Sequence, residues 1–260
     1  MLEIYKFTAM TTPCEVKLYC DDKITSDNCI KDIMSECKRL EVKYNFYDAS
    51  SYLNKLNNRI TNILDNETKS LLSISKQYYK QTNKIFDVTI ATIKEDNSLK
   101  SYVGCNNFNI KKNKIYFTNE YTKIDLGGFV KEYSVNQAIK IIKKYKIKSA
   151  LVNFGGDIYA LGVKPDGSKY NIAITNPKNK DETLFSIDIS NQALTTSALY
   201  EREGHIQSLS SLNDDILSVT VVSSCTIKSG VYSTSYMING NIKTSLEVYI
   251  INKNLEVINI

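Results

Sequence analysis

Residues 123–133 read KIDLGGFVKEY, and this stretch indicates how the middle of the chain folds. Residues 123–126 have the composition of a short strand, and apolar residues recur at helical spacing from Val130 onward. Gly127 and Gly128 stand between the two patterns, where glycine permits a sharp turn. The stretch therefore predicts a strand, a glycine turn and a long helix that begins at the turn.

The same stretch carries the features of an anion-binding site. Glycines let the backbone approach a phosphate closely, and the first N–H groups of a helix point toward such a group. Lys131 adds a compact positive charge, and Asp125 is placed to hydrogen-bond a base or a ribose. The alternative is that Gly127 and Gly128 only form the turn, and this segment alone leaves both readings open.

A second glycine pair follows another predicted strand. Residues 151–162 read LVNFGGDIYALG, in which Gly155 and Gly156 lie between the polar residues Asn153 and Asp157. Taken alone, the pair is typical of a tight turn at the end of a buried strand. Neither glycine pair fits the pattern G-x-G-x-x-G, which disfavours a Rossmann dinucleotide site.

Helical and strand-like stretches are interspersed along the chain, which predicts an α+β fold. The expected helices are residues 27–40, capped by Ser26 or Asp27, a short helix through Leu53 and Leu56, capped by Ser50 or Ser51, residues 67–83, the helix after Gly128, and residues 228–238. The expected strands include residues 85–90, 114–119, 185–189, 193–197, 216–223 and 246–251. Since no linker is obvious, residues 1–260 are expected to form a single domain, which could consist of two intimately packed lobes.

The composition argues against several classes of protein. The net charge of +5 comes from 33 lysines and arginines against 28 acidic residues, and the lysines are scattered, so nucleic-acid binding is not expected. One histidine and six cysteines without a C-x-x-C pair disfavour a zinc site and predict buried, reduced thiols. The sequence contains no long apolar run, so neither a membrane span nor a signal peptide is predicted. A cytoplasmic location is expected for the chain as given, and a periplasmic or membrane-anchored one if an export signal has been removed.

Six blocks of the sequence resemble, in order, those of the ApbE family of FAD:protein FMN transferases. They are residues 7–16 (FTAMTTPCEV), 47–57 (YDASSYLNKLN), 84–90 (KIFDVTI), 124–133 (IDLGGFVKEY), 151–162 (LVNFGGDIYALG) and 193–206 (ALTTSALYEREGHI). The resemblance implies an ApbE-like, T-fold-related arrangement of mixed sheets with packed helices.

The resemblance also implies a function. Members of the family bind FAD with a divalent metal, cleave its pyrophosphate and attach FMN to a threonine hydroxyl of a partner protein. The positions that match the family's FAD contacts are Met10, Tyr47, Phe86, Asp87, Val88, Asp125, Lys131 and Ile206. Lys131 would neutralise phosphate charge, and His205 is the candidate for handling the proton of the threonine.

The chain departs from the family pattern where a metal ligand is expected. The family segment A-D-A-x-S-T-A corresponds to residues 229–235, SGVYSTS, so Gly230 stands in place of the aspartate. Thr234 and the carbonyl of Gly128 remain as candidate ligands for Mg²⁺, and the family's K-G-Y-x-x-D helix has Glu132 and Asn136 instead of glycine and aspartate. The alternative function is therefore a degenerate, non-catalytic module that binds FAD or another nucleotide. Replacing Gly230 by Asp is expected to install metal dependence.

Overall fold

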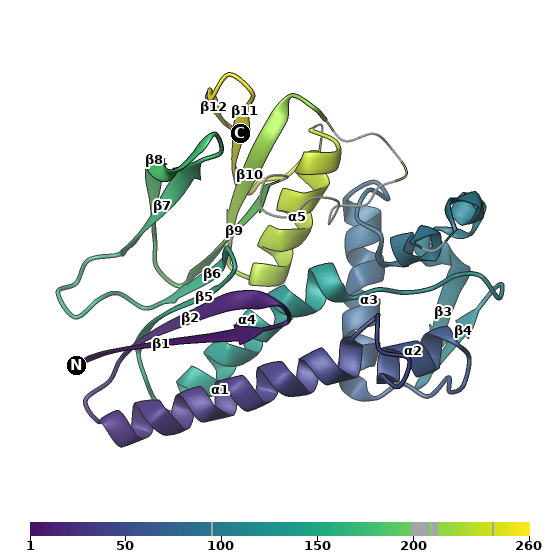
Figure 1. The fold of residues 1–260 in the computed structure, drawn as a ribbon, viewed down its shortest axis with the longest axis horizontal. Helices are drawn as coiled ribbons and strands as arrows, with labels where there is room; N and C mark the ends of the chain where they lie inside the picture. Colours follow the sequence, from purple (N-terminus) through teal and green to yellow (C-terminus); the bar gives the residue numbers. More distant parts are fainter. Residues whose placement is uncertain (95, 199–208, 210–212, 241) are drawn as a thin grey trace.

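An eight-stranded antiparallel sheet forms the centre of the molecule (Figure 1). The computed structural model describes residues 1–94, 96–198, 209, 213–240 and 242–260. In spatial order the strands are β1 (Leu2–Ala9), β2 (Thr12–Tyr19), β5 (Ser149–Phe154), β6 (Asp157–Leu161), β9 (Gln192–Ala198), β10 (Ile216–Ser223), β11 (Glu247–Asn252) and β12 (Val257–Asn259). Short hairpins join β1 to β2, β5 to β6 and β11 to β12, whereas α5 lies in the connection between β10 and β11.

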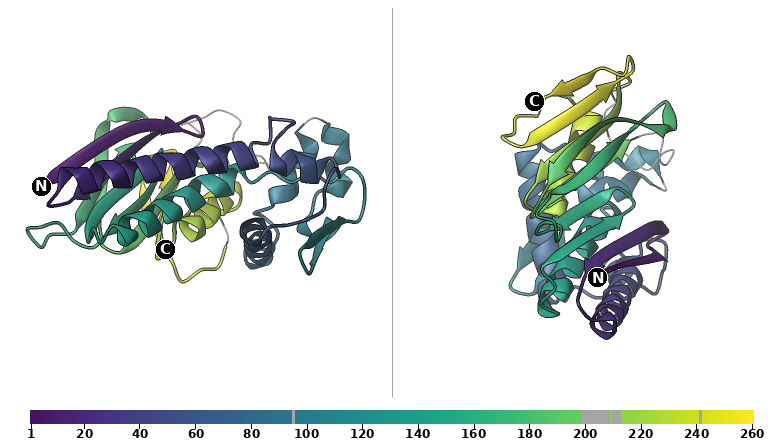
Figure 2. Two further views of the ribbon diagram at one scale, coloured as in Figure 1. Left: turned by 90° about the horizontal axis from the view of Figure 1, so that it is seen from below. Right: turned by 90° about the vertical axis from the view of Figure 1, so that its left-hand side faces the viewer.

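Three helices cover one face of the sheet: α1 (Lys23–Tyr44), α4 (Gly127–Lys144) and α5 (Thr226–Ile238). Figure 2 shows α1 and α4 running side by side along the sheet. Period-two alternation makes this packing possible, since Val16 and Leu18 of β2 point at the helices and are fully buried. The hairpin of β7 (Tyr170–Asn176) and β8 (Asn179–Ile189) packs its apolar side chains against the other face.

A smaller, mainly helical region lies at one end of the sheet (Figure 1). It contains α2 (Tyr52–Asn57), α3 (Asn66–Gln81), the 3₁₀ helices η1 (Val88–Ile93), η2 (Asn97–Tyr102) and η3 (Cys105–Asn107), and the hairpin of β3 (Phe108–Lys111) and β4 (Lys114–Phe117). Its core includes Leu53, Leu71 and Phe108, and Phe129 and Val130 from the start of α4 complete it. The helix that follows the first glycine pair therefore links this region to the sheet.

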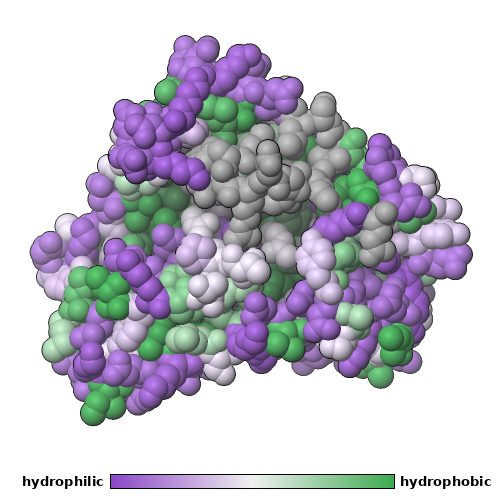
Figure 3. All heavy atoms as spheres, viewed as in Figure 1, coloured by the Kyte–Doolittle hydropathy of each residue, from purple (hydrophilic) through white to green (hydrophobic). Residues whose placement is uncertain are grey.

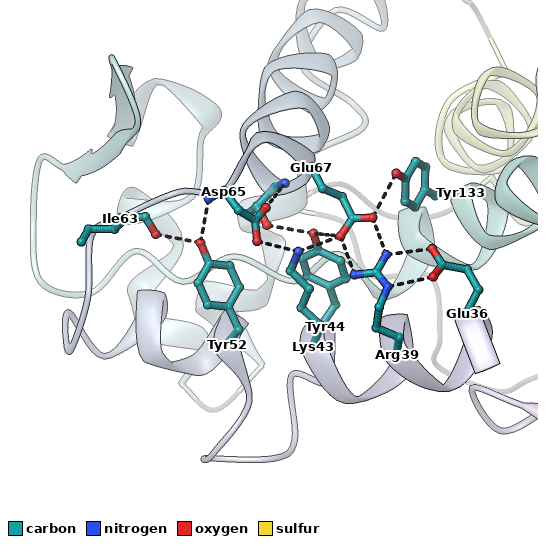
Figure 4. A network of polar contacts seen from close by, with 10 residues as sticks. Glu36, Arg39, Lys43, Tyr44, Tyr52, Ile63, Asp65, Glu67 and Tyr133 are labelled. Carbon is teal, nitrogen blue, oxygen red and sulfur yellow. Dashed lines mark hydrogen bonds and ion pairs between the residues drawn. The ribbon is translucent and has the colours of Figure 1, made fainter.

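A network of polar contacts around Glu67 joins three helices (Figure 4). Glu67, in the first turn of α3, accepts hydrogen bonds from Arg39 and Lys43 of α1 and from Tyr133 of α4. Burial acts to raise the pKa of Glu67, but the hydrogen bonds and charges of Arg39 and Lys43 lower it to about 2. The carboxylate is therefore ionised at neutral pH and holds the mainly helical region against α1 and α4.

Most of the elements expected from the sequence are present, and the α+β class is confirmed. The predicted strand 216–223 is β10, and the predicted helix 228–238 is α5, which starts two residues earlier. The helix predicted from residue 27 begins at Lys23 with Asp22 as its cap, so the expected caps Ser26 and Asp27 are wrong. The division into one domain or two lobes stays a prediction.

Two of the predicted strands are wrong, because side chains satisfy their backbone groups. Residues 123–126 pair with no strand of the described chain: the side chain of Asn57 bonds both the N–H and the C=O of Ile124. Residues 85–90 contain the start of η1, whose N–H at Thr89 is capped by the Asp87 carboxylate. Asparagine and aspartate side chains compete in this way with a strand ladder.

Hydrophilic residues cover most of the described part of the face seen in Figure 3, with hydrophobic residues interspersed among them. All six cysteines are free thiols, and Cys14, Cys29, Cys37 and Cys105 are buried, which agrees with the expected reduced state. Within the described residues, no helix combines the length and the apolar character needed to cross a bilayer.

Candidate functional site

The second glycine pair forms the turn of the β5–β6 hairpin. Gly155 has φ 60° and Gly156 has φ 91°, the left-handed conformations of a two-residue hairpin turn. A Cβ on Gly155 would lie 2.2 Å from Cγ2 of Thr12. Thr12 follows the β1–β2 turn, which contains Met10, so the two turns lie next to each other at one end of the sheet. The glycines here are required by the fold.

The first glycine pair is different. Neither Gly127 nor Gly128 has a positive φ, and Gly128 (φ −81°, ψ 17°) interrupts the regular helix near its start. Beyond its own neighbours in the chain and the helix, a Cβ on Gly128 would meet no atom of the described residues within 4 Å. The fold therefore does not require glycine at residue 128, and the exposed backbone there is open to the approach of a ligand.

Lys131 connects the start of α4 to the second glycine turn. Its Nζ lies 2.7 Å from Oδ2 of Asp157, the first residue of β6, directly after Gly156. The Asp157 side chain is 2% exposed, whereas that of Lys131 is 24% exposed. An ammonium group is thus fixed between the two glycine pairs by a buried carboxylate. The sequence pointed to Asp157 as a polar residue of the turn but did not assign it to the site.

Asp125 occupies a second polar cluster with Tyr47. The Asp125 carboxylate accepts a hydrogen bond from the N–H of Gly127 at 2.7 Å and pairs with Nζ of Lys94 at 2.5 Å. Lys94 also donates to the Tyr47 hydroxyl and lies over the rings of Phe46 and Tyr47. The structure brings together the predicted contacts Tyr47 and Asp125 through Lys94. The sequence analysis missed Lys94, since no motif marks it.

The other predicted contacts of the KIFDVTI block lie beside the segment that contains Asp125 and leads into α4. The carbonyl of Val88 accepts the N–H of Asp125 at 2.8 Å, and the ring of Phe86 packs on Phe129 with centroids 6.0 Å apart. The Asp87 carboxylate accepts from the N–H and hydroxyl of Thr89, and burial raises its pKa. This segment therefore positions the loop that leads into α4.

The position where a metal-binding aspartate was expected faces a different carboxylate. A Cβ on Gly230 of α5 would lie 2.7 Å from both Cγ and Oε1 of Glu132 on α4. Glu132 is 6% exposed, and its Oε2 has no hydrogen-bond partner among the described residues. Burial, and then the negative charge of Asp157, raise the pKa of Glu132. Thr234 lies one helical turn beyond Gly230 on the same helix.

The carboxylate oxygens in this region suit a metal cation that is bound partly by the protein and partly by the phosphates of a substrate. The described residues contain no group of three or more histidine, cysteine, aspartate or glutamate side chains that could hold a metal ion. Mg²⁺, however, is commonly bound by one or two carboxylates together with substrate phosphates and water. The unpartnered Oε2 of Glu132 and the adjacent Asp157 charge fit this pattern.

The expected effect of Gly230→Asp needs correction. An aspartate at residue 230 would overlap the side chain of Glu132, so the single substitution cannot add a ligand without displacing that side chain. His205 and Ile206, the remaining predicted site residues, lie outside the described residues.

Solved structures with the same fold include proteins named ApbE, one of which is called a flavin transferase. The ApbE protein of Thermotoga maritima superposes with a TM-score of 0.88 at 20% identity, covering 100% of this chain and 97% of that chain. The flavin transferase ApbE of Vibrio cholerae superposes with a TM-score of 0.85 at 18% identity, covering 100% and 96%.

Sequence comparisons point to the same relatives. An FAD:protein FMN transferase of Klebsiella pneumoniae (strain 342) is 27% identical over 124 residues, which are 43% of this chain and 37% of that protein. The protein of that name from Escherichia coli (strain K12) is 24% identical over 149 residues, 50% of this chain and 42% of that protein. The chain thus matches less than half the length of these relatives. The model of the ApbE family matches residues 10–258, and the chain therefore belongs to the ApbE family.

Proposed function

We propose that the protein transfers FMN from FAD to a threonine hydroxyl of a partner protein. The observation that carries the proposal is the family match over residues 10–258, which includes every residue of the candidate site. The relatives named FAD:protein FMN transferase support FAD as the substrate and a protein as the acceptor. The acceptor is identified here only by its chemistry, as a protein with an accessible threonine.

The two polar clusters suit distinct tasks in the proposed reaction. Lys131, held by Asp157, would neutralise the charge of the FAD pyrophosphate beside the backbone of Gly127 and Gly128. Asp125 and Tyr47 would contact the rest of the dinucleotide, and Asp125 would exchange its pairing with Lys94 for a hydrogen bond to the ligand. Met10, Phe86, Asp87, Val88 and Ile206 remain the further proposed contacts.

The proposed reaction is an in-line displacement at the phosphorus of the FMN half. The threonine oxygen forms the new P–O bond, the P–O bond to AMP breaks, and AMP leaves with the bridging oxygen. The hydroxyl proton passes to a base, for which His205 is the candidate. Magnesium, when bound, would supply further neutralisation of the phosphate oxygens, and the candidate ligands are Thr234 and the Gly128 carbonyl.

A non-catalytic module that binds FAD without turnover is the second candidate. Its motivating feature is Gly230, which removes the expected carboxylate from α5. The position of Glu132 weakens this motive, because its carboxylate occupies the space beside Gly230. The family match and the names of the relatives also favour the transferase.

Covalent flavin on an acceptor tests the proposal. The purified chain is incubated with FAD, Mg²⁺ and total protein of the cells in which it is made, and flavin fluorescence is read on denatured, separated proteins. A fluorescent band whose threonine carries FMN by mass spectrometry is expected. Lys131→Gln should abolish the band, whereas Lys140→Gln, at an exposed position of the same helix, should not. Absence of covalent flavin under varied metals would contradict the proposal.

A further inference from the structure

Two departures from the family pattern meet at a single contact. Glu132 stands where the pattern has glycine, and Gly230 stands where it has aspartate. The two residues are 98 positions apart in the sequence, as the numbers 132 and 230 give, yet a Cβ at residue 230 would touch the Glu132 side chain at 2.7 Å. A carboxylate is therefore present between α4 and α5, but it is attached to α4.

The environment of Glu132 is unusual for a purely structural glutamate. Its side chain is almost fully buried, and Oε2 finds no hydrogen-bond donor among the described residues. Buried polar atoms are nearly always paired, so an unpaired carboxyl oxygen indicates a missing partner. The negative charge of Asp157 raises the pKa of Glu132 and the positive charge of Lys131 lowers it, so a cation is a suitable partner for the unpaired oxygen of Glu132.

Lys131 does not fill this role. Its ammonium pairs with Oδ2 of Asp157, and Oε2 of Glu132 still lacks a partner. Hydroxyl groups gather on the adjoining turn of α5, where Ser197 of β9 bonds to both Ser233 and Thr234. The region thus offers carboxylate and hydroxyl oxygens, the donors that a hard divalent cation prefers.

We propose that Glu132 is the carboxylate ligand of a divalent-cation site between α4 and α5, replacing the aspartate absent from residue 230. Thr234 is the nearby group that would complete it, with the phosphates of the dinucleotide and water in the remaining positions. The inference rests on the proposed function, because the cation would face the pyrophosphate that Lys131 approaches.

Cation binding is measured directly, with Mn²⁺ as the probe. Mn²⁺ is titrated into the whole chain in the presence of saturating FAD and without acceptor. The loss of the free Mn²⁺ signal in electron paramagnetic resonance measures binding. The native chain should bind one Mn²⁺ that Mg²⁺ displaces. Glu132→Gln, which keeps the shape and removes the charge, should weaken binding at least tenfold. Glu120→Gln, an exposed carboxylate, should leave the affinity unchanged.

A second variant guards against loss of the fold. The double substitution Glu132→Gly with Gly230→Asp moves the carboxylate from α4 to α5 and removes the overlap between the two side chains. It should regain most of the Mn²⁺ affinity that Glu132→Gly alone loses. Native affinity in a folded Glu132→Gln chain, or no Mn²⁺ binding by the native chain, would overturn the inference.

The outcome is separable from that of the proposed function. Mn²⁺ binding that depends on Glu132, without any covalent flavin on an acceptor, would support the cation site and contradict the transferase. Covalent flavin transfer that is insensitive to Glu132→Gln, with unchanged Mn²⁺ affinity, would do the reverse.

Discussion

The side chain of Glu132 on α4 fills the space beside Gly230 on α5 that any larger residue at position 230 would need. The residue types at positions 230 and 132 are therefore sterically coupled: Glu132 as placed requires a residue without a side chain at position 230. The contact between α4 and α5 contains the carboxylate of Glu132, and a second carboxylate at position 230 would overlap it. This coupling has a direct consequence for stability.

Gly230→Asp alone should destabilise the fold by about 1–3 kcal/mol, the usual cost of overpacking a buried contact. The pair Glu132→Gly with Gly230→Asp should be more stable than the sum of the two single changes predicts, because neither side chain then overlaps the other. Urea denaturation of the four proteins of this double-mutant cycle measures the coupling free energy. Strict additivity would show that the two residues do not contact each other.

The turn at Gly155 should be intolerant of a side chain for two separate reasons. Gly155→Ala must adopt φ 60° and places its Cβ 2.2 Å from Cγ2 of Thr12, so a loss of about 2–4 kcal/mol is expected. Gly167→Ala is the matched control, since φ there is 82° but a Cβ would meet no described atom within 4 Å. Thermal unfolding should show the smaller loss for Gly167→Ala. Equal losses would mean that the Thr12 contact contributes nothing.

Glu67 should make stability depend on acidity. Its pKa in the folded chain is lowered from 4.5 to about 2, so the carboxylate stabilises the fold above pH 4.5, and this contribution is lost as the pH falls toward 2. Glu67→Gln should therefore cost about 2 kcal/mol at pH 7, allowing for solvent screening, and almost nothing near pH 2. Denaturation across this pH range, with Glu120→Gln as the exposed control, measures the difference. A cost that does not change with pH would refute the ion-pair assignment.

Asp125 should matter for FAD binding rather than for folding. Asp125→Asn removes the charge while it keeps an oxygen that can accept from Gly127, so the fold should persist. FAD affinity should fall about tenfold, the equivalent of one charge-assisted hydrogen bond. A flavin fluorescence titration tests this, with the exposed Asp21→Asn as the control. An unchanged affinity would remove Asp125 from the list of FAD contacts.

The sequence predicted those parts of the fold that depend on local patterns. β-rich composition predicted β10 over residues 216–223, and helical periodicity predicted α5 from residue 228, although most residues of both elements are buried. The segment around Ile124 could not be distinguished from a strand by its sequence, since the hydrogen bonds of Ile124 are made with Asn57, 67 positions away. Local patterns carry no information about such partners.

The candidate site was predictable only where a motif named its residues. Lys131 and Asp125 belong to such a motif. In the structure Lys131 pairs with the buried carboxylate of Asp157, and Asp125 pairs with the partly buried ammonium of Lys94. Lys94 lies in no motif, and only the structure shows that it pairs with Asp125 and lies over the ring of Tyr47. The sequence contained both changes at Glu132 and Gly230, but their contact depends on how α4 packs on α5, which only the fold shows.

The central claim is that this chain transfers FMN from FAD to a protein threonine. The most direct measurement follows AMP release and covalent flavin together, in one reaction of the purified chain with FAD, Mg²⁺ and the acceptor pool. The account predicts one AMP released for each FMN attached, and loss of both in Lys131→Gln. Saturable FAD binding with neither AMP nor flavinylated protein would contradict it.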